Sequence, residues 1–316
     1  MAQGRCLAYS PAALRLRVDV VAAFSTTGSI AFLMPQVMAP ESGTAIPPEP
    51  AAPDGAEPVG RSLEVRLALT PDEIHAAQRL RYDVFYEEME AKPSPEVAAE
   101  KRDFDRFDPI CDHLLVFDKT GGKDSVVACY RLLRGEVAAR HFGFYTADEY
   151  DIAPLLARQA QGERMLELGR SCVARAYRSA AAMSLLWRGL IPYLEQHRID
   201  VMFGCASLPG TDPGQLSLPL AYLHHFHAMP EAERISAVAG RRVSMDLMPK
   251  AMINEKEAMR TLPPLVKGYI RTGALIGDGA VVDHEFGTTD VFIYFPVAKI
   301  DRRWLAFLIK KGAGEG

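Results

Sequence analysis

The stretch Leu166–Met183, LELGRSCVARAYRSAAAM, sets two charges inside a segment that otherwise reads as a buried strand. Leu166 and Leu168 have strand character, whereas Glu167 and Arg170 lie among the apolar residues. A buried charge is costly unless a partner neutralises it. Small residues then open a long apolar helix. The stretch therefore predicts a strand that carries charges into a cleft and continues into a helix.

The surrounding segments predict a mixed α/β domain, because strand-like alternation and helix-like periodicity follow each other along the chain. Thr70-Pro71-Asp72-Glu73 combines an N-cap, a proline at the first helical position and a capping-box glutamate. The strand–helix–strand run from Arg164 to Cys205 has the spacing of a crossover between parallel strands. Expected strands span 62–69, 113–118, 125–134, 164–173, 200–205 and 291–297, expected helices span 71–89, 150–160, 179–197 and 215–227, and a long loop is expected over 90–112.

The N-terminal part differs from the rest in composition. Residues 18–39 are rather apolar, but an aspartate, a glycine and a proline interrupt them before about 18 clean apolar residues accumulate. We therefore expect no membrane anchor here. Prolines crowd the residues that follow, which is typical of a disordered linker. The predicted organisation is a disordered, proline-rich leader over 1–60 and one folded domain over 61–311.

Composition excludes several classes of protein. The chain has 316 residues and a formal net charge of −4, so no strongly basic surface for nucleic acid is expected. Its five cysteines are odd in number and widely spaced, which argues against a disulfide framework or a zinc cluster. A reducing cytoplasm fits this pattern.

Two motifs that suggest other chemistry fail on geometry. His113 and Asp118 have the His-x4-Asp spacing of glycerolipid acyltransferases, but they flank a strand and should point to opposite faces. The histidines of residues 224–227 do not have a metalloprotease spacing, and neighbouring residues on a helix point about 100° apart. We expect no metal site.

What remains is a set of charges in otherwise apolar elements. These charges can neutralise one another around a polar cleft, either as a purely structural network or as a functional site. A functional cleft is favoured because the charges come from four separate segments. The set consists of Arg81, Asp105, Asp108, Arg131, Glu167 and Arg170.

Together these segments resemble two related families with the GNAT-like fold. The similarity is to acyl-homoserine-lactone synthases and, more closely, to bacterial L-ornithine N-α-acyltransferases. It covers roughly residues 62–305, and the motifs are specific in combination. They are R81-Y-D-V-F85, F104-D-R-F-D108, Y130-R-L-L133, L166-E-L-G-R-S-C-V173 with Y177-R178, F203-G-C-A-S-L-P-G-T-D-P213 and L262-P-P-L-V-K-G-Y269.

The resemblance implies a GNAT-like domain with a mixed, mostly antiparallel sheet flanked by helices. It implies transfer of an acyl chain, usually 3-hydroxylated, from acyl carrier protein to the α-amine of L-ornithine, which gives lyso-ornithine lipid. The co-substrate is then the 4′-phosphopantetheine thioester of the carrier protein, and no resident cofactor is expected. A cytoplasmic enzyme, with a peripheral position on the inner membrane, suits a lipid product.

The resemblance also suggests roles for the charged residues. Glu167 would act as the general base, or would organise a water that does so. Asp105 and Asp108 would hold the ammonium groups of ornithine. The arginines Arg81, Arg131 and Arg170 would contact the carboxylate or lock the acids in place, and Phe85 would belong to the substrate-binding set.

GNAT-like folds also carry a bulge in the central strand, and Gly169 is the expected bulge residue. It would let Glu167 and Arg170 face one cleft. Ser207 and the backbone of Leu168–Arg170 are the candidate oxyanion contacts. The turn at R178-S-A-A-A-M183 lacks the glycines typical of coenzyme A binding, which favours a carrier protein. Its acidic surface would meet Arg175, Arg178 and Arg188.

Three alternatives stay open from the sequence. One is an acyl-homoserine-lactone synthase that uses S-adenosylmethionine. A second is an N-acyltransferase for another amino acid, such as lysine or glutamine. The third is not an enzyme: a peripheral membrane binding module, in which the charged residues would tolerate substitution without loss of activity.

Overall fold

The computed structural model describes residues 16–18, 62–120, 124–178 and 180–300 of the chain. The predicted leader lies outside the described residues apart from 16–18, and so does the end of the predicted domain, 301–311. In the described part, no helix is both long and apolar enough to cross a lipid bilayer.

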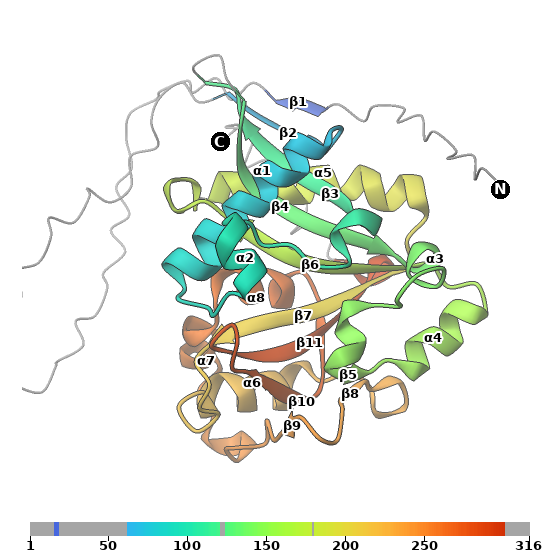
Figure 1. Ribbon diagram of the computed structural model, residues 1–316. Coiled ribbons are helices and arrows are strands. Elements are labelled where there is room, and N and C mark those ends of the chain that lie inside the picture. Colours follow the sequence, from blue (N-terminus) through green and yellow to red (C-terminus); the bar gives the residue numbers. More distant parts are fainter. Residues whose placement is uncertain (1–15, 19–61, 121–123, 179, 301–316) are drawn as a thin grey trace, which may run out of the picture.

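One twisted sheet of 11 strands runs through the described domain, with helices on both of its faces (Figure 1). Its order is β1-β2-β3-β4-β6-β7-β11-β10-β8-β5, and β9 pairs with β10. Neighbouring strands are antiparallel except for β6 with β7 and β10 with β8. The strands are β1 Leu16–Val18, β2 Leu63–Leu67, β3 Asp112–Asp118, β4 Ser125–Arg134, β5 Tyr150–Asp151, β6 Met165–Val173, β7 Val201–Pro209, β8 Ser236–Ala237, β9 Arg242–Val243, β10 Leu275–Asp283 and β11 Thr288–Pro296.

The helices begin where local capping signals lie. The Thr70 side chain accepts a hydrogen bond from the Glu73 amide and Glu73 bonds back, so the predicted capping box is confirmed. The helix that follows continues from α1 into a π-helical turn, Asp83–Glu88, as far as the sequence predicted. The α-helices are α1 Pro71–Tyr82, α2 Pro95–Glu100, α3 Gly135–Ala138, α4 Ala153–Ala160, α5 Ala180–His197, α6 Ser217–His227, α7 Glu255–Thr261 and α8 Pro264–Arg271.

The sheet has two buried faces, which explains the nearly continuous apolar runs in its central strands. On β3, Leu115 and Phe117 join the cluster under α1, whereas Leu114 and Val116 join the larger cluster under α5. Side chains alternate between the faces of a strand, so these two helices cover opposite faces of the sheet (Figure 1).

The one crossover between central strands, β6–α5–β7, creates an opening in the sheet. β6 pairs with β7 only from Met165 to Glu167, while β7 continues to pair with β11 as far as Pro209. Beyond Glu167 the two strands diverge, as Figure 1 shows. The backbone of β6 past this point therefore has no ladder partner on the β7 side.

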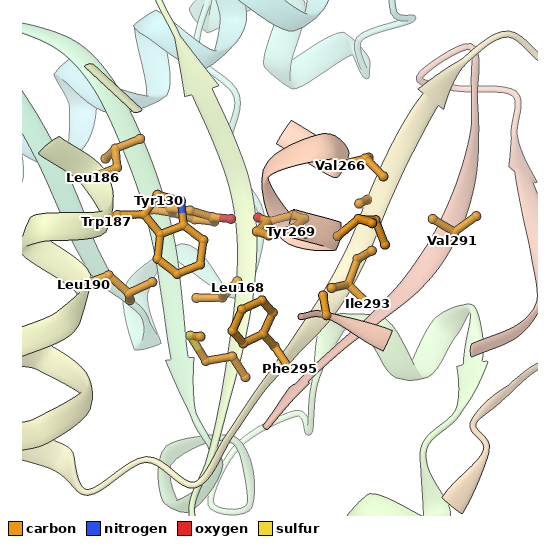
Figure 2. Packing of buried hydrophobic residues seen from close by; sticks show 14 of the residues in the cluster. Tyr130, Leu168, Leu186, Trp187, Leu190, Val266, Tyr269, Val291, Ile293 and Phe295 are labelled. Atoms are coloured by element: carbon orange, nitrogen blue, oxygen red, sulfur yellow. The ribbon is translucent and has the colours of Figure 1, made fainter. Parts of the chain in front are cut away.

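Aromatic side chains fill the base of this separation. The Trp187 ring lies 5.9 Å from Phe295 and 6.3 Å from Tyr269, measured between centroids. Figure 2 shows these rings around Leu168, with α5 on one side and α8 on the other. We call Trp187, Tyr269 and Phe295 the aromatic wedge. It packs against both diverging strands and supports their separation.

The predicted fold class and the crossover connection are confirmed. The expected loop over 90–112 is wrong in part, because α2 forms within it behind the N-cap Ser94 and Pro95. The expected helix over 150–160 begins only at Ala153, after the short strand β5. Helices α7 and α8 and strand β10 were not predicted.

Candidate active site

The central strand β6 carries a bulge immediately beyond the point where β7 leaves it. Cys129 pairs with Cys172 and Arg131 with Gly169, so Tyr130 on β4 faces two residues of β6. Arg170 is one of them and has φ = 50°, the left-handed conformation that glycine usually supplies. The predicted bulge is therefore present, but its left-handed residue is Arg170 and not Gly169.

Arg170 occupies this unfavourable conformation because its side chain is held by ion pairs. Nε lies 3.2 Å from Asp103 and Nη2 lies 3.4 Å from Asp105. Arg131 bridges Asp105 at 2.7 Å and Asp108 at 3.3 Å. Arg81 bridges Asp108 and Asp103, each at 2.7 Å. Each aspartate thus joins two arginines, and the pairs close into an alternating ring of six residues.

This charge ring neutralises itself. It holds three arginines and three aspartates, and the Arg81 side chain is only 1% exposed. Burial alone would raise the pKa of Asp105, but Arg131 and Arg170 outweigh it and lower the pKa to about 2. For Asp103, burial likewise opposes ionisation, yet Arg170 and Arg81 hold its pKa below the usual range. Both of these acids are therefore carboxylates at neutral pH.

Tyr145 connects the charge ring to the neighbouring carboxylate. The guanidinium of Arg170 lies 4.9 Å from the centre of the Tyr145 ring, and that of Arg131 lies 5.8 Å from it. The backbone amide of Tyr145 donates to Glu167 at 3.1 Å, and the amide of Thr146 donates at 2.7 Å. The 3-10 turn that begins at Tyr145 thus fixes the orientation of Glu167.

Glu167 combines near-complete burial with hydrogen bonds from the backbone. It is 5% exposed. Burial raises the pKa of its carboxyl above the ordinary value, and the Thr146 and Tyr145 amides offset only part of that rise. A carboxylate with a raised pKa at a fixed position is suited to accept a proton near neutral pH.

A cavity of about 240 Å³ lies in the separation of β6 and β7. Both Glu167 and Arg170 line it, as the predicted bulge requires. A smaller apolar cavity of about 20 Å³ lies against the aromatic wedge and shares Leu168, Cys205 and Tyr269 with the first. The polar wall of the larger cavity includes Arg131, Tyr145, Thr146, Glu167, Arg170, Ser207, Asp283, Thr288 and Asp290.

A second group of acids lies along this cavity, away from the charge ring. Carboxylate oxygens of Glu149, Asp283 and Asp290 all lie within 4.8 Å of one another. Burial, followed by repulsion from Asp290, raises the pKa of Glu149 to about 7. Burial also raises the pKa of Asp290, although hydrogen bonds from Ser207 and Thr288 work against it. Glu149 and Asp290 are thus destabilised as anions, unlike Asp103 and Asp105.

The structure places most of the predicted site residues at this cavity. Phe85, Leu168, Gly169 and Ser207 line it, and the Phe85 ring contacts Phe286 edge to face. Asp105, Asp108 and Arg81 belong to the charge ring and do not themselves line the cavity.

The arginines expected to contact a carrier protein are more dispersed. Arg175 and Arg178 are exposed, and Arg178 pairs with Glu88 at 2.6 Å. Arg188 is half-buried on α5, and within the described chain its Nη1 has no hydrogen-bond partner.

Four acidic residues of the site were not predicted from the sequence. Asp103 closes the charge ring, and its position two residues before Asp105 was the available signal. Glu149, Asp283 and Asp290 had no signal, because an acid beside a turn or in a late strand is normally solvated.

Comparisons with known proteins agree with this architecture. Residues 80–188 match a domain family described as an acetyltransferase (GNAT) domain. The chain is 50% identical over 249 residues to an L-ornithine N(alpha)-acyltransferase of Brucella abortus, covering 78% of this chain and 88% of that protein. An L-ornithine N(alpha)-acyltransferase of Rhizobium meliloti is 49% identical, covering 78% of this chain and 84% of that protein. This chain belongs to the L-ornithine N(alpha)-acyltransferase family.

Among solved structures, this L-ornithine N(alpha)-acyltransferase family member is similar to more distant proteins. An N-acyl amino acid synthase from uncultured soil microbes has a TM-score of 0.42 at 12% identity, covering 75% of this chain and 92% of that one. An acyl-homoserine-lactone synthase has a TM-score of 0.39 at 13% identity, covering 75% of this chain and 91% of the other.

Proposed function

We propose that this enzyme transfers an acyl chain from the thioester of acyl carrier protein to the α-amine of L-ornithine. The carrying observation is the position of Glu167: a buried carboxylate with a raised pKa in the cavity between β6 and β7. The family to which the chain belongs supports ornithine as the acceptor. No resident cofactor takes part, and the acylated carrier protein is the co-substrate.

The reaction needs a base because an ammonium group cannot attack a thioester. In the proposed mechanism the α-ammonium gives a proton to Glu167, directly or through one water. The free amine attacks the carbonyl carbon, a C–N bond forms, and the C–S bond then breaks. The phosphopantetheine thiolate leaves and takes up the second proton that the attacking nitrogen loses as the amide forms. Glu167 then releases the first proton to solvent. The raised pKa of Glu167 suits a group that must gain and release a proton in every cycle.

The developing oxyanion needs donors that lie beyond the paired part of β6. Leu168, Gly169 and Ser207 line the cavity on the two diverging strands. The backbone amides of β6 lose their β7 partner after Glu167, which leaves that edge of the strand available to a thioester carbonyl. We assign the oxyanion contact to this edge of β6. The Ser207 hydroxyl has a single donor and would join this contact by giving up its hydrogen bond to Asp290.

The aromatic wedge marks the path for the acyl chain. The smaller cavity beneath it is lined by apolar residues, among them Leu168, Trp187 and Ile293 (Figure 2). A volume of about 20 Å³ holds no fatty chain, so the chain enters by displacing wedge side chains. A lipid product also supports our proposal of a cytoplasmic enzyme that works beside the inner membrane.

For the donor, we propose carrier protein rather than coenzyme A. The segment before α5 lacks the glycines that bind a pyrophosphate, and Arg175 and Arg178 are exposed near it. An acidic carrier protein would bind such a surface.

The test is a donor and acceptor panel with the purified full chain. 3-Hydroxyacyl carrier protein and 3-hydroxyacyl-coenzyme A are each supplied with L-ornithine, L-lysine, L-glutamine or S-adenosylmethionine, and amide products are measured by mass spectrometry. We expect N-α-acylornithine with the carrier protein as the preferred donor. Turnover of S-adenosylmethionine alone, or of lysine in preference to ornithine, would refute the acceptor. Equal rates with both donors would refute the carrier-protein partner.

A further inference from the structure

The acids beside the cavity differ from the charge ring in one respect: their charges are not matched by an equal number of ion-paired arginines. The ring balances three arginines against three aspartates. Around Glu149, Asp283 and Asp290, the cation within ion-pair range in the described structure is Arg241, whose Nη2 is 3.7 Å from Glu149. The Arg241 side chain is 40% exposed and so neutralises Glu149 weakly. The cluster therefore carries an excess of negative charge.

Glu149 gives a second and independent indication of a ligand. Its side chain is 3% exposed, and the Cys205 thiol is a weak hydrogen-bond partner of the carboxyl group, yet in the described part of the molecule Oε2 has no hydrogen-bond partner by distance and angle. A buried carboxylate oxygen without a partner costs free energy that a folded protein usually avoids. Asp283 and Asp290, which lie within 4.8 Å of it, both line the cavity. A cation in the cavity would satisfy all three acids.

We propose that Glu149, Asp283 and Asp290 bind the side-chain ammonium of the amino-acid acceptor. This assignment rests on the proposed function, since it divides ornithine between two sites: the α-amine at Glu167 and the δ-ammonium at the acid cluster. A primary ammonium has three N–H donors, one for each carboxylate.

The 3-10 turn Tyr145–Asp148 links the two sites along the backbone. The Thr146 amide holds Glu167, and the Glu149 amide donates to the Thr146 carbonyl at 3.0 Å. Thr146 and Glu149 are three positions apart, and a 3-10 helix rises about 2 Å per residue, so their backbone positions lie roughly 6 Å apart along the turn. Five single bonds of about 1.5 Å join the two nitrogens of ornithine, so the extended molecule also spans roughly 6 Å.

The acid cluster is thereby assigned a role in specificity. A site with buried carboxylates rejects an analogue that lacks the ammonium, because the acids would remain unpaired. L-Norvaline is that analogue: it has the ornithine skeleton without the δ-amine. A hard divalent metal ion is the competing occupant, but it requires about six to eight oxygen ligands.

The experiment measures kcat and KM for L-ornithine and L-norvaline with acylated carrier protein, in the wild type, Glu149→Gln and Asp283→Asn. We expect the wild type to prefer ornithine by at least about a hundred-fold in kcat/KM. In each variant the preference should fall at least tenfold, mainly through a higher KM for ornithine. The carboxamide introduced by Asp283→Asn retains an oxygen for the Glu285 and Phe286 amides, so this variant keeps its turn. Exposed Glu231→Gln is the matched control and should keep the wild-type preference.

Several outcomes decide the assignment. A wild-type preference that survives both substitutions overturns the ammonium site and leaves ornithine acylation standing. Loss of wild-type activity in chelator, restored by Mg²⁺ or Ca²⁺, also overturns it in favour of a metal site. If the wild type acylates no ornithine, the proposed function fails. Calorimetric titration of ornithine and norvaline then decides the ammonium site, which is refuted if ornithine binds no more tightly than norvaline.

Discussion

Glu149→Gln should change how the stability of the folded chain depends on pH. The carboxyl of Glu149 faces Asp290 on β11, Asp283 at the end of β10, the Cys205 thiol on β7 and the exposed Arg241. Burial first, and then repulsion from Asp290, raises its pKa from 4.5 to about 7. Glutamine has no charge to lose or gain, so the variant lacks this contribution.

The sign and size follow from proton linkage. A pKa that is higher in the folded state favours folding below the unfolded-state pKa, and this stability is lost as pH rises through the folded-state pKa. For a shift from 4.5 to about 7, the loss is small near pH 5 and close to complete near pH 8. At about 1.4 kcal/mol per pKa unit, the wild type should lose roughly 2.5 kcal/mol more than Glu149→Gln between about pH 5 and about pH 8.

Urea unfolding of both proteins at the two pH values measures this difference. The remaining titrating groups are common to both chains, so their contributions largely cancel in the comparison. The melting temperature of the variant relative to the wild type should rise by roughly 5–10 °C over the same pH interval, as expected for a domain of about this size. A stability difference that does not change with pH would refute the reasoning, because Glu149 would then titrate as a solvated acid. Saturating ornithine should reduce the pH dependence in the wild type if its ammonium binds the ionised form.

Three further substitutions test the site and its support. Glu167→Gln should lower kcat by about 10²–10⁴-fold while circular dichroism shows an intact fold. Wild-type activity should decline as the pH falls through the raised pKa of Glu167. An unaltered kcat in the variant would refute the role of Glu167 as the base. Gly204→Ala puts a Cβ 2.3 Å from the Leu168 carbonyl oxygen on β6 and should lower the free energy of unfolding in urea by about 1–3 kcal/mol. Gly268→Ala is the control: it has open space around it and should be neutral or stabilising. Equal effects of the two substitutions would contradict the close approach of β7 to β6. Asp103→Asn removes a counterion of Arg81 and Arg170 and should lower the free energy of unfolding by about 3–5 kcal/mol. The exposed control Asp124→Asn should lower it by less than about 1 kcal/mol. Similar losses in both variants would show that the charge ring contributes little to stability.

Local signals account for the parts of the fold that the sequence predicts. The capping box at Thr70, the hairpin around residues 118–125 and the crossover from β6 to β7 each depend on residues close in sequence. Strand β10 in the C-terminal part lacks such a signal. Gly277 and Gly279 occupy positions in β10 where apolar side chains would otherwise continue the strand alternation, so the sequence pattern does not predict a strand there.

The site residues also divide into those that local sequence signals predict and those that depend on contacts between distant segments. The unusual charges at Arg81, Arg131 and Arg170 were visible because apolar elements contain them, and burial without neutralisation is costly. Which acid joins which arginine depends on how distant segments meet, so Asp103 could not be distinguished from its neighbours. Glu149 is harder still, since the acids that face it, Asp283 and Asp290, lie on strands more than 100 residues away in the sequence. The bulge position was displaced by one residue because ion pairing, rather than glycine, holds the left-handed backbone.

The closed charge ring also bears on how the chain folds. Its residues come from α1, the segment before β3, strand β4 and strand β6. A partly assembled domain that lacks any one of these segments would bury charge without its counterion, and such states are penalised by several kcal/mol. Intermediates that dock the elements one at a time are thereby disfavoured, and the four segments should unfold together. Amide hydrogen exchange would report them as a single cooperative unit.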